Sequence, residues 1–345
     1  MKSIGEMIPE IASETLDKMA RGYELSQLLF TACEYGLFTL LTEEKEARQV
    51  SQELKTDPAM TEKFLNALTA AGLLIKSNGR YSNTPLADTF LVQGKPFYQG
   101  NLLKLVSKGY HDWSKLGQVL KEGAGRKAGE RPAKNVFNES FILAMAEGAL
   151  RGTLQQTVDV ISGLPEFAGV KEMLDLGGGH GLYAIALAQK KPDLKAVVFD
   201  LPHAVDVTRD FINRYGMQEK VKVIAGDFNR DELGGGYDLV LASDVFYRPK
   251  EAVTGVMRKI FESLNDGGIF ILKQWMLNDE GTGPLTAVLF DLKLSLSNNQ
   301  HYLYTTRESI DLCCQVGFKD IQVIDISIPA KPSTLIIARK NSEIS

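Results

Sequence analysis

This sequence contains the stretch Leu174-Asp175-Leu176-Gly177-Gly178-Gly179-His180-Gly181, which joins an apolar segment to a helical pattern through Ala184–Ala188. The apolar segment, Glu172–Leu176, predicts a buried strand, and glycines allow the chain to turn tightly from strand into helix. Backbone N–H groups at the start of such a helix can bind a ligand that lies against the glycines. A glycine-rich turn alone is compatible with a dinucleotide, a mononucleotide or simple close packing, so its neighbours have to decide between them.

The spacing of the glycines disfavours a dinucleotide. The fingerprint G-x-G-x-x-G, started at Gly177, requires glycine at a position where this chain has Leu182. Asp200 ends the next predicted strand, where a carboxylate can accept both ribose hydroxyls. Asp227, in Gly226-Asp227-Phe228, ends the strand after that, where an acceptor beside an aromatic face can hold an adenine. The turn and the two acids together predict a nucleoside site.

The carboxyl-terminal half of the chain alternates strand and helix patterns. Strands are predicted at Glu172–Leu176, Ala196–Asp200, Val221–Ala225, Tyr237–Ala242, Ile269–Lys273, Ile321–Ile324 and Leu335–Arg339. An apolar helical stripe runs from Val253 to Leu264, and a capping box at Thr305 and Glu308 begins a helix that ends at Gly317. This alternation predicts an α/β fold with a doubly wound, Rossmann-like sheet of seven strands and helices on both faces.

The amino-terminal part is predicted to be mainly helical. The stripe of a half-buried helix is formed by Leu25, Leu28, Leu29, Ala32 and Cys33. A later helix begins at Asp57-Pro58, and Asn78-Gly79 predicts the turn of a hairpin. Helices followed by a hairpin are typical of a winged helix. We therefore expect a winged-helix-like domain at residues 1–95, a helical linker and pocket roof at 96–165, and the Rossmann-like domain at 166–345.

Composition and charge argue against several classes of protein. The net charge of −4 gives no electrostatic reason to expect nucleic acid or an anionic membrane as partner, and four basic residues against six acids between Glu43 and Gly72 disfavour a DNA-binding winged helix. No run of about 18 apolar residues predicts a membrane span. The three cysteines lack metal or disulfide spacing, which favours a reducing, cytoplasmic compartment, and no His/Asp/Glu cluster predicts a metal.

The chain resembles the O-methyltransferases typified by plant caffeate methyltransferases and by bacterial polyketide and phenazine methyltransferases. The resemblance covers nearly the whole chain, and its specific stretches are Leu174–Gly181, Phe199–His203, Gly226–Phe228, Tyr237–Tyr247 and Gly267–Leu277. It implies S-adenosylmethionine as cofactor, a small aromatic acceptor, and a homodimer formed by a winged-helix-like dimerisation domain. The apolar residues expected at the dimer interface are Leu25, Leu28 and Leu29, with Met7 and Ile11 of the amino-terminal arm.

The resemblance also implies the residues of the site. The cofactor is expected at Asp175, Gly177, Gly179, Asp200, Leu201, Asp227, Phe228 and Ser243, the last standing where the family usually has lysine. Phe141 and Met145 share one helix face and are expected over the methyl group and the acceptor. Further contacts with a flat, apolar acceptor are expected from His111, Gln274, Trp113, Trp275, Met276 and Phe290.

The histidine base of the plant-type members is missing. Tyr247 stands in its place, and the two carboxylates that orient the histidine fall on Gln274 and near Leu303. Because a tyrosine has a pKa of about 10, it is a poor base at neutral pH and suits a hydrogen-bond donor or a proton relay better. We hypothesise that Tyr247 points at the acceptor group and hydrogen-bonds it.

Three interpretations of the missing base stay open. In the first, the acceptor is itself acidic, so that positioning suffices. In the second, the reaction is C-methylation of a tetrapyrrole-like ring, because the bacteriochlorophyllide methyltransferase branch of the family likewise has tyrosine at this position. In the third, another residue is the base. His301 and His111 are the candidates for that role, whereas His180 is expected to contact cofactor or solvent and His203 to lie beside the cofactor. A protein of another class also stays open, one that binds cofactor without transferring methyl or a regulatory winged-helix protein.

Overall fold

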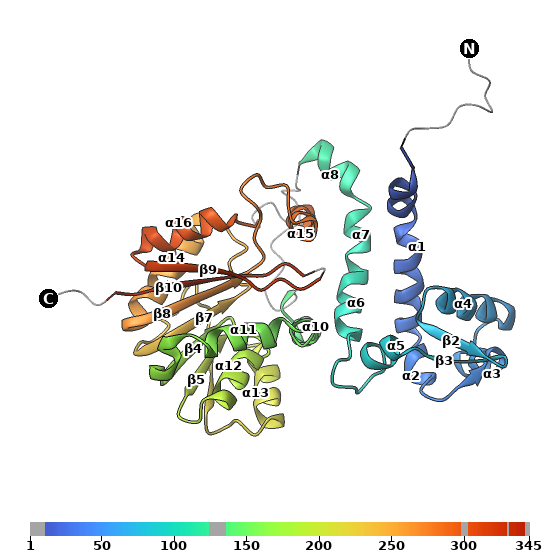
Figure 1. The fold of residues 1–345 in the computed structure, drawn as a ribbon, viewed down its shortest axis with the longest axis horizontal. Helices are drawn as coiled ribbons and strands as arrows, with labels where there is room; N and C mark the ends of the chain where they lie inside the picture. The colour runs from blue at the N-terminus through green and yellow to red at the C-terminus, as the bar shows by residue number, and fades with distance from the viewer. Residues whose placement is uncertain (1–10, 124–135, 298–302, 330, 342–345) are drawn as a thin grey trace, which may run out of the picture. The chain divides into compact units, whose positions relative to one another are not determined.

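A computed structural model of the chain describes residues 11–123, 136–297, 303–329 and 331–341. The chain divides into two units, Met1–Ser107 and Lys108–Ser345, and their elements can be followed in Figure 1.

The first unit is mainly helical. Its helices are α1 (Glu14–Glu34), α2 (Leu37–Leu40), α3 (Ala47–Leu54), α4 (Pro58–Ala70), α5 (Pro85–Phe90) and α6 (Gly100–Lys108), the last of which reaches the boundary. Its strands β1 (Lys45–Glu46), β2 (Leu74–Ser77) and β3 (Arg80–Asn83) form an antiparallel sheet of order β1-β3-β2. As predicted, Asp57 caps α4 by accepting a 2.8 Å hydrogen bond from the N–H of Met60, with Pro58 at the first helical position. Asn78 and Gly79 have φ of 50° and 78°, the left-handed conformation of a tight hairpin turn.

The long helix α1 keeps much of its apolar surface in water. Leu28, Leu29 and Cys33 pack against the core of this unit around the buried Ala32, as the stripe predicts. Leu25, which we expected on the same half-buried stripe, is 62% exposed, because only the end of α1 packs on the core. Leu16 and Met19 are also largely exposed.

The second unit holds the α/β sheet. The described strands are β4 (Glu172–Leu176), β5 (Lys195–Asp200), β6 (Val221–Ala225), β7 (Tyr237–Ser243), β8 (Leu264–Gln274), β9 (Lys319–Asp325) and β10 (Thr334–Arg339). They form a seven-stranded sheet of order β6-β5-β4-β7-β8-β10-β9. Neighbouring strands from β6 to β8 are parallel, whereas β10 is antiparallel to both β8 and β9. The predicted doubly wound fold is confirmed, with a mixed edge.

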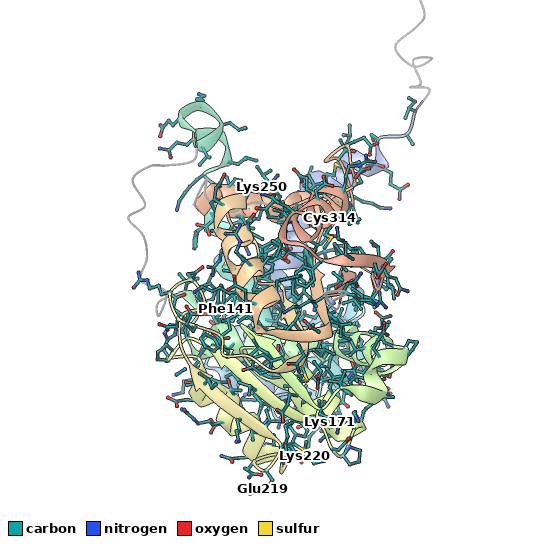
Figure 2. The ribbon with its side chains drawn as sticks, turned by 90° about the vertical axis from the view of Figure 1, so that its left-hand side faces the viewer. Phe141, Lys171, Glu219, Lys220, Lys250 and Cys314 are labelled. Carbon is teal, nitrogen blue, oxygen red and sulfur yellow. The ribbon has the colours of Figure 1, made fainter. Side chains whose placement is uncertain are left out.

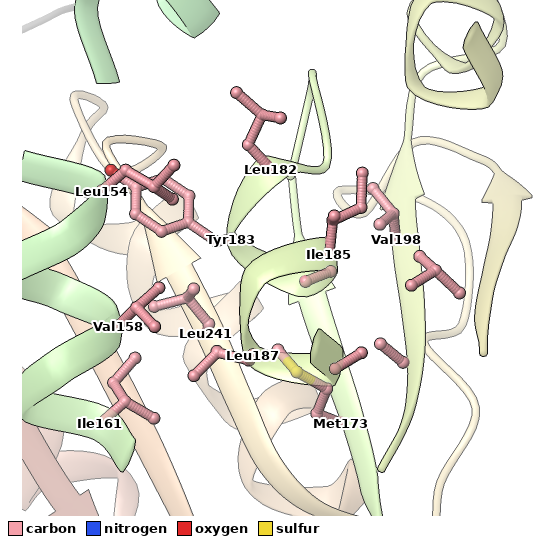
Figure 3. Packing of buried hydrophobic residues seen from close by; sticks show 14 of the residues in the cluster. Leu154, Val158, Ile161, Met173, Leu182, Tyr183, Ile185, Leu187, Val198 and Leu241 are labelled. Carbon is pink, nitrogen blue, oxygen red and sulfur yellow. The ribbon is translucent and has the colours of Figure 1, made fainter. Parts of the chain in front are cut away.

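Helices cover both faces of this sheet (Figure 1). The helices of this unit are α7 (Tyr110–Trp113), α8 (Leu116–Glu122), α10 (Glu139–Ala149), α11 (Thr153–Ser162), α12 (Leu182–Lys190), α13 (Val205–Arg214), α14 (Lys250–Ser263), α15 (Leu285–Ser297) and α16 (Thr306–Val316), with a short 3₁₀ turn at Pro165–Gly169. The helices from α10 through α13 pack on one face of the sheet in one hydrophobic core. Helices α14 and α16 pack on the other face in a second core. Figure 3 shows Leu154 and Val158 of α11 against Tyr183 of α12 and Leu241 of β7 in the first core.

One predicted boundary is wrong. Leu264 was expected at the end of the helical stripe, but it is the first residue of β8 and pairs with Tyr237. Its side chain is nevertheless buried in the same core as the α14 stripe, so the burial that the pattern predicted is correct. The capping box of Thr305 and Glu308 and the end of α16 at Gly317 are confirmed.

The strand order places the switch point of the sheet at the carboxyl ends of β4 and β7. The chain leaves β4 toward β5 and β6 on one side and returns to add β7 on the other, and ligands of open α/β sheets bind at such a switch point. In Figure 2 Phe141 of α10 lies far from Lys171 and Lys220, which precede β4 and β6. Helix α10 therefore lies toward the carboxyl ends of the strands.

Candidate active site

The glycine turn is built so that side chains cannot enter it. Gly177, Gly179 and Gly181 have φ of 64°, 51° and 69°, a backbone conformation that residues other than glycine rarely adopt. A Cβ on Gly177 would also lie 2.6 Å from Cγ1 of Val245. Beside Gly179 the space is open, since a Cβ there would meet nothing nearer than Ile142 of α10 at 3.8 Å. The backbone of the turn is thus presented toward α10 at the end of β4.

Asp200 is fixed at the opening of the turn. Its carboxylate accepts 2.7 Å and 2.6 Å hydrogen bonds from the N–H groups of Gly179 and Leu201. Burial raises the pKa of Asp200, although these two backbone bonds oppose the rise. The turn and the end of β5, two separate predicted parts of the nucleoside site, are therefore brought together by direct hydrogen bonds.

Asp175 is a wholly buried carboxyl group below the turn. Neither of its oxygens makes a hydrogen bond of ordinary geometry within the described residues. Burial raises its pKa to about 7; the nearby N–H of Ala184 lowers it and the charge of Asp200 raises it further. A buried group of this kind changes its protonation with small changes in its surroundings.

The predicted adenine end contains two residues that the sequence patterns did not single out. Oδ1 of Asp227 accepts hydrogen bonds from the backbone N and from Nδ2 of Asn229, at 3.0 and 2.6 Å. Arg248 donates a 2.6 Å bond to Oδ1 of Asn229, and its guanidinium lies 4.8 Å from the centre of the Phe228 ring. Asn229 thus links Asp227 to Arg248, which directly follows Tyr247 in the chain.

Tyr247 belongs to a partly buried polar group that was also not predicted. Its hydroxyl donates to Oδ1 of Asp244 at 2.7 Å, and Nζ of Lys273 lies 2.5 Å from Oδ2 of the same carboxylate. Asp244 has φ of 57°, a strained backbone at the end of β7, and Lys273 at the end of β8 is only 1% exposed. The two charges are held together where parallel strands end side by side.

The electrostatics of this group argue against Tyr247 as a base. Burial and then the charge of Asp244 raise the pKa of Tyr247 well above its usual 10. Burial opposes the charged forms of Asp244 and Lys273, but their mutual attraction prevails, so the pKa of Asp244 is lowered and that of Lys273 is raised. The phenol, the carboxylate and the ammonium all keep their ordinary charges at neutral pH.

The ring of Tyr247 lies among aromatic side chains. Its centre is 5.3 Å from that of Phe290, which in turn is 5.1 Å from Trp275, both in edge-to-face contacts. The backbone N–H of Trp275 donates to the Tyr247 hydroxyl at 3.2 Å. Gln274, expected to contact the acceptor, is wholly buried and donates a 3.3 Å bond to the carbonyl of Phe246, so it orients the segment before Tyr247.

The helix expected above the acceptor is α10. Asn138 caps it by accepting a 3.1 Å bond from the N–H of Phe141, and Phe141 and Met145 are half-buried. Ile142 of the same helix faces the glycine turn.

The remaining predicted polar residues occupy different surroundings. His180 was expected to contact cofactor or solvent; contact with solvent is wrong, because its ring is buried and Nδ1 accepts a 3.1 Å bond from the N–H of Leu182. Burial, followed by the charges of Lys331 and Lys273, lowers its pKa to about 3. His111 is exposed on α7, a helix in contact with α15, and His203 is half-buried. Ser243 donates a 3.3 Å bond to Asp244.

Two of the residues named in the predictions cannot be placed in the structure. His301 and Met7 lie outside the described residues. Leu303, at the position matched to a carboxylate in relatives, is buried, and its N–H donates a 2.7 Å bond to Asp291 of α15. Within the described ranges no cluster of three His, Cys, Asp or Glu side chains is arranged to hold a metal. Over the same ranges no helix is long and apolar enough to cross a membrane.

A seven-stranded, mainly parallel sheet with one antiparallel strand inserted near its edge is the architecture of class I methyltransferases. The chain belongs to the O-methyltransferase family: the O-methyltransferase domain matches residues 113–319, and the O-methyltransferase dimerisation domain matches residues 18–93.

Individual relatives carry different acceptors in their names. The 3-hydroxy-5-methyl-1-naphthoate 3-O-methyltransferase of Streptomyces sahachiroi is 28% identical over 317 residues, covering 91% of this chain and 92% of the relative. The L-tyrosine C(3)-methyltransferase of Streptomyces lavendulae is 28% identical over 340 residues, covering 92% and 90%. The structure of human N-acetylserotonin methyltransferase in complex with SAM superposes with a TM-score of 0.81 at 24% identity, covering 97% of this chain and 100% of that chain, which shows the fold.

Proposed function

We propose that this protein transfers a methyl group from S-adenosylmethionine to the hydroxyl of a small aromatic or polycyclic acceptor. The observation that carries the proposal is the Asp200 carboxylate, hydrogen-bonded to the N–H of Gly179 in a turn whose glycines have positive φ and leave open space beside Gly179. Family membership of the chain supports the reaction type.

The residues present fit the cofactor. Asp200 would accept the ribose hydroxyls, while Asp227 and Phe228 would hold the adenine. Oδ1 of Asp227 accepts from Asn229, and among the described residues its Oδ2 lies 3.7 Å from Nε of Arg230, so Oδ2 is the oxygen that would accept from the adenine. Gly177 and Gly179 let the ligand approach the backbone, with Asp175, Leu201 and Ser243 completing the surroundings. When bound, S-adenosylmethionine supplies an activated methyl group on a sulfonium, and the protein has to hold the acceptor oxygen in line with it.

On the acceptor side, Tyr247 orients and does not deprotonate. Its proton is directed to Asp244 and its oxygen accepts from the N–H of Trp275, so the phenol is held in one orientation beside the aromatic cluster, where it would contact the acceptor hydroxyl. Such a contact would turn a lone pair of the acceptor toward the methyl group. Phe141, Met145 and the Trp275–Phe290 pair would enclose the ring of the acceptor.

A second candidate is C-methylation of an electron-rich ring, including a tetrapyrrole-like one. The specific observation in its favour is that Tyr247 lacks the character of a base while the aromatic cluster around it is retained. The L-tyrosine C(3)-methyltransferase among the relatives supports its place in this family. His301 and His111 stay candidate bases for the O-methylation, and a protein that binds cofactor without transferring methyl stays the alternative of another class.

Two measurements test the proposed function. Calorimetric titration of S-adenosylhomocysteine should show micromolar binding that Asp200→Asn weakens about tenfold or more, because a carboxylate that accepts several donors is replaced by an amide. Asp206→Asn, which removes an exposed carboxylate paired with Arg209 on α13, is the matched control and should bind like wild type. Mass spectrometry of acceptors, beginning with 3-hydroxy-5-methyl-1-naphthoate and N-acetylserotonin, should detect a gain of one methyl group. Wild-type protein that does not bind S-adenosylhomocysteine would contradict the proposal.

We also propose that the first unit forms a homodimer. The match to a dimerisation domain and the exposed Leu16, Met19 and Leu25 of α1 support it, because such an apolar face is costly in water. Light scattering at micromolar concentration should give twice the 38.0 kDa mass of the chain, and a monomer would contradict it.

A further inference from the structure

A second ammonium group, which is partly buried, lies near the Asp244–Lys273 pair. Lys331 precedes β10, and its Nζ donates to the carbonyl of Gly148 at 2.8 Å and to Oγ1 of Thr153 at 3.2 Å. Both partners are neutral. Among the described residues Lys331 forms no ion pair with a carboxylate, whereas Lys273 has Asp244 at 2.5 Å. An ammonium has three N–H donors, so one donor of Lys331 is left for a ligand.

The charges around Lys331 add up to a positive surplus. Burial lowers the pKa of Lys331 most, to about 8; Lys273 and Arg151 lower it further, and Asp244 alone raises it. At neutral pH the group is still mainly protonated. His180, which responds to both lysines, is neutral and cannot balance them. At Lys331 itself, the charges of Lys331, Lys273 and Arg151 stand against the carboxylate of Asp244, so an anion beside this ammonium would be stabilised.

A cavity adjoins this ammonium. Its volume is about 490 Å³, within the range of small-molecule sites, and Lys331 lines it together with the apolar Met276, Leu277 and Ile328. Asn278 and Thr306 add neutral polar groups. Of its described lining residues only Asp325 has a carboxylate, which is exposed and accepts a 2.8 Å bond from the N–H of Ser327.

Three observations place the cavity near the proposed acceptor side. Gly148, which holds Lys331, comes three residues after Met145 and so lies on the same side of α10. Met276 follows Trp275, whose N–H binds Tyr247. Asp244, the partner of Tyr247, acts on Lys331 through its charge.

We propose that the cavity is a subsite of the acceptor pocket in which the free N–H of Lys331 binds a carboxylate carried by the aromatic acceptor. The acceptor class is then an aromatic hydroxy acid, with the hydroxyl toward Tyr247 and the acid toward Lys331. The inference rests on the proposed function, because it names the acceptor of that same site.

Two probes that differ only in a carboxylate test the subsite: 3-hydroxy-2-naphthoate and 2-naphthol. Each is titrated calorimetrically into full-length protein saturated with S-adenosylhomocysteine. Wild type should bind the acid roughly tenfold to a hundredfold more tightly than the alcohol, the value of a charge-assisted hydrogen bond. Lys331→Met should abolish the preference and Lys331→Arg should retain most of it.

Lys340→Met is the matched control. Lys340 likewise donates to a backbone carbonyl, that of Leu264 at 2.7 Å, and lies over an aromatic ring, that of Phe261, but does not line the cavity. It should keep the wild-type preference. Equal binding of the two probes by wild type, no binding of either at millimolar concentration, or an unchanged preference in Lys331→Met would overturn the subsite. Loss of S-adenosylhomocysteine binding in wild type would instead count against the proposed function.

Discussion

Replacing Asp244 by asparagine should destabilise the second unit strongly. The substitution keeps the shape of the side chain but removes the charge that lies 2.5 Å from Nζ of Lys273. Lys273 is 1% exposed, so its ammonium cannot turn to water in place of the lost partner. Leaving one member of a buried ion pair unpaired costs about 3–5 kcal/mol. In a unit of this size, that cost corresponds to a fall in Tm of roughly 6–20 °C.

The loss of stability in Asp244→Asn should depend on pH, and the direction of this dependence follows from the pKa of Lys273. In wild type Asp244 raises the pKa of Lys273, so the pair stabilises below the ordinary lysine pKa and loses this contribution only in strong alkali. In Asp244→Asn the largest influence on Lys273 is burial, which lowers its pKa, and Tyr183 opposes it in part. The unfolded chain then binds more protons than the folded one, and stability relative to wild type should recover as pH rises from about 7 to 10.

The assay is guanidinium denaturation followed by circular dichroism, with the double variant Asp244→Asn/Lys273→Met. That double variant should recover part of the lost stability, because it no longer buries an unpaired charge. Asp159→Asn is the control: its pair with Lys190 is 2.7 Å long but exposed, so the loss should be below about 1 kcal/mol. The reasoning fails if Asp244→Asn unfolds within 1 kcal/mol of wild type, or if adding Lys273→Met gives no recovery.

Three further predictions concern the site. Arg248→Met should weaken S-adenosylhomocysteine binding about tenfold, because it releases Asn229 and the Phe228 ring. The control Arg230→Met removes an 85% exposed guanidinium 3.7 Å from Asp227 and should change the Kd less than twofold. Equal effects of the two substitutions would refute the role of Arg248 at the adenine end. The pKa of Asp175 is about 7 in the folded chain and about 4 when unfolded, so cofactor-free protein should lose stability as pH rises through this window, and denaturation curves of Asp175→Asn should lack that loss. Tyr247→Phe should lower kcat/KM about tenfold or more, with unchanged S-adenosylhomocysteine binding, because the acceptor loses its orienting bond; an unchanged kcat/KM on an identified acceptor would disprove the role.

The cofactor half of the site was predictable because it is encoded locally. A short apolar strand, a turn that needs positive φ and a carboxylate at the next strand end each leave a mark within a few residues, as at Gly177 and Asp200. Parallel neighbouring strands then bring those ends together. The hydrogen bond from Gly179 to Asp200 spans 21 residues of sequence but only one strand-to-strand step.

The acceptor half depends on contacts that no local pattern contains. Asp244 and Lys273 are 29 residues apart, and they meet only because β7 and β8 are neighbours that end together. A lysine at the end of an apolar strand is typical of an exposed strand end, and Asp244 in isolation resembles a loop residue. Lys331 and Gly148 are 183 residues apart, and most strands of the sheet lie between them in the sequence. Charge pairing over such separations requires the strand order and the side-chain directions of the folded chain.

Together these features have one consequence for the proton of the acceptor hydroxyl. Tyr247 keeps its proton, Asp244 is held ionised by Lys273 and His180 stays neutral with a pKa of about 3, so none of these three groups has the pKa of a general base near neutrality. If no group outside those residues supplies the base, the acceptor hydroxyl has to be acidic enough to lose its proton as the methyl group arrives. A cationic surplus beside the pocket, centred on Lys331, would favour that loss by stabilising negative charge on the acceptor. A phenol conjugated to an electron-withdrawing group should then be methylated and an aliphatic alcohol should not, which the product spectra of such a pair would show.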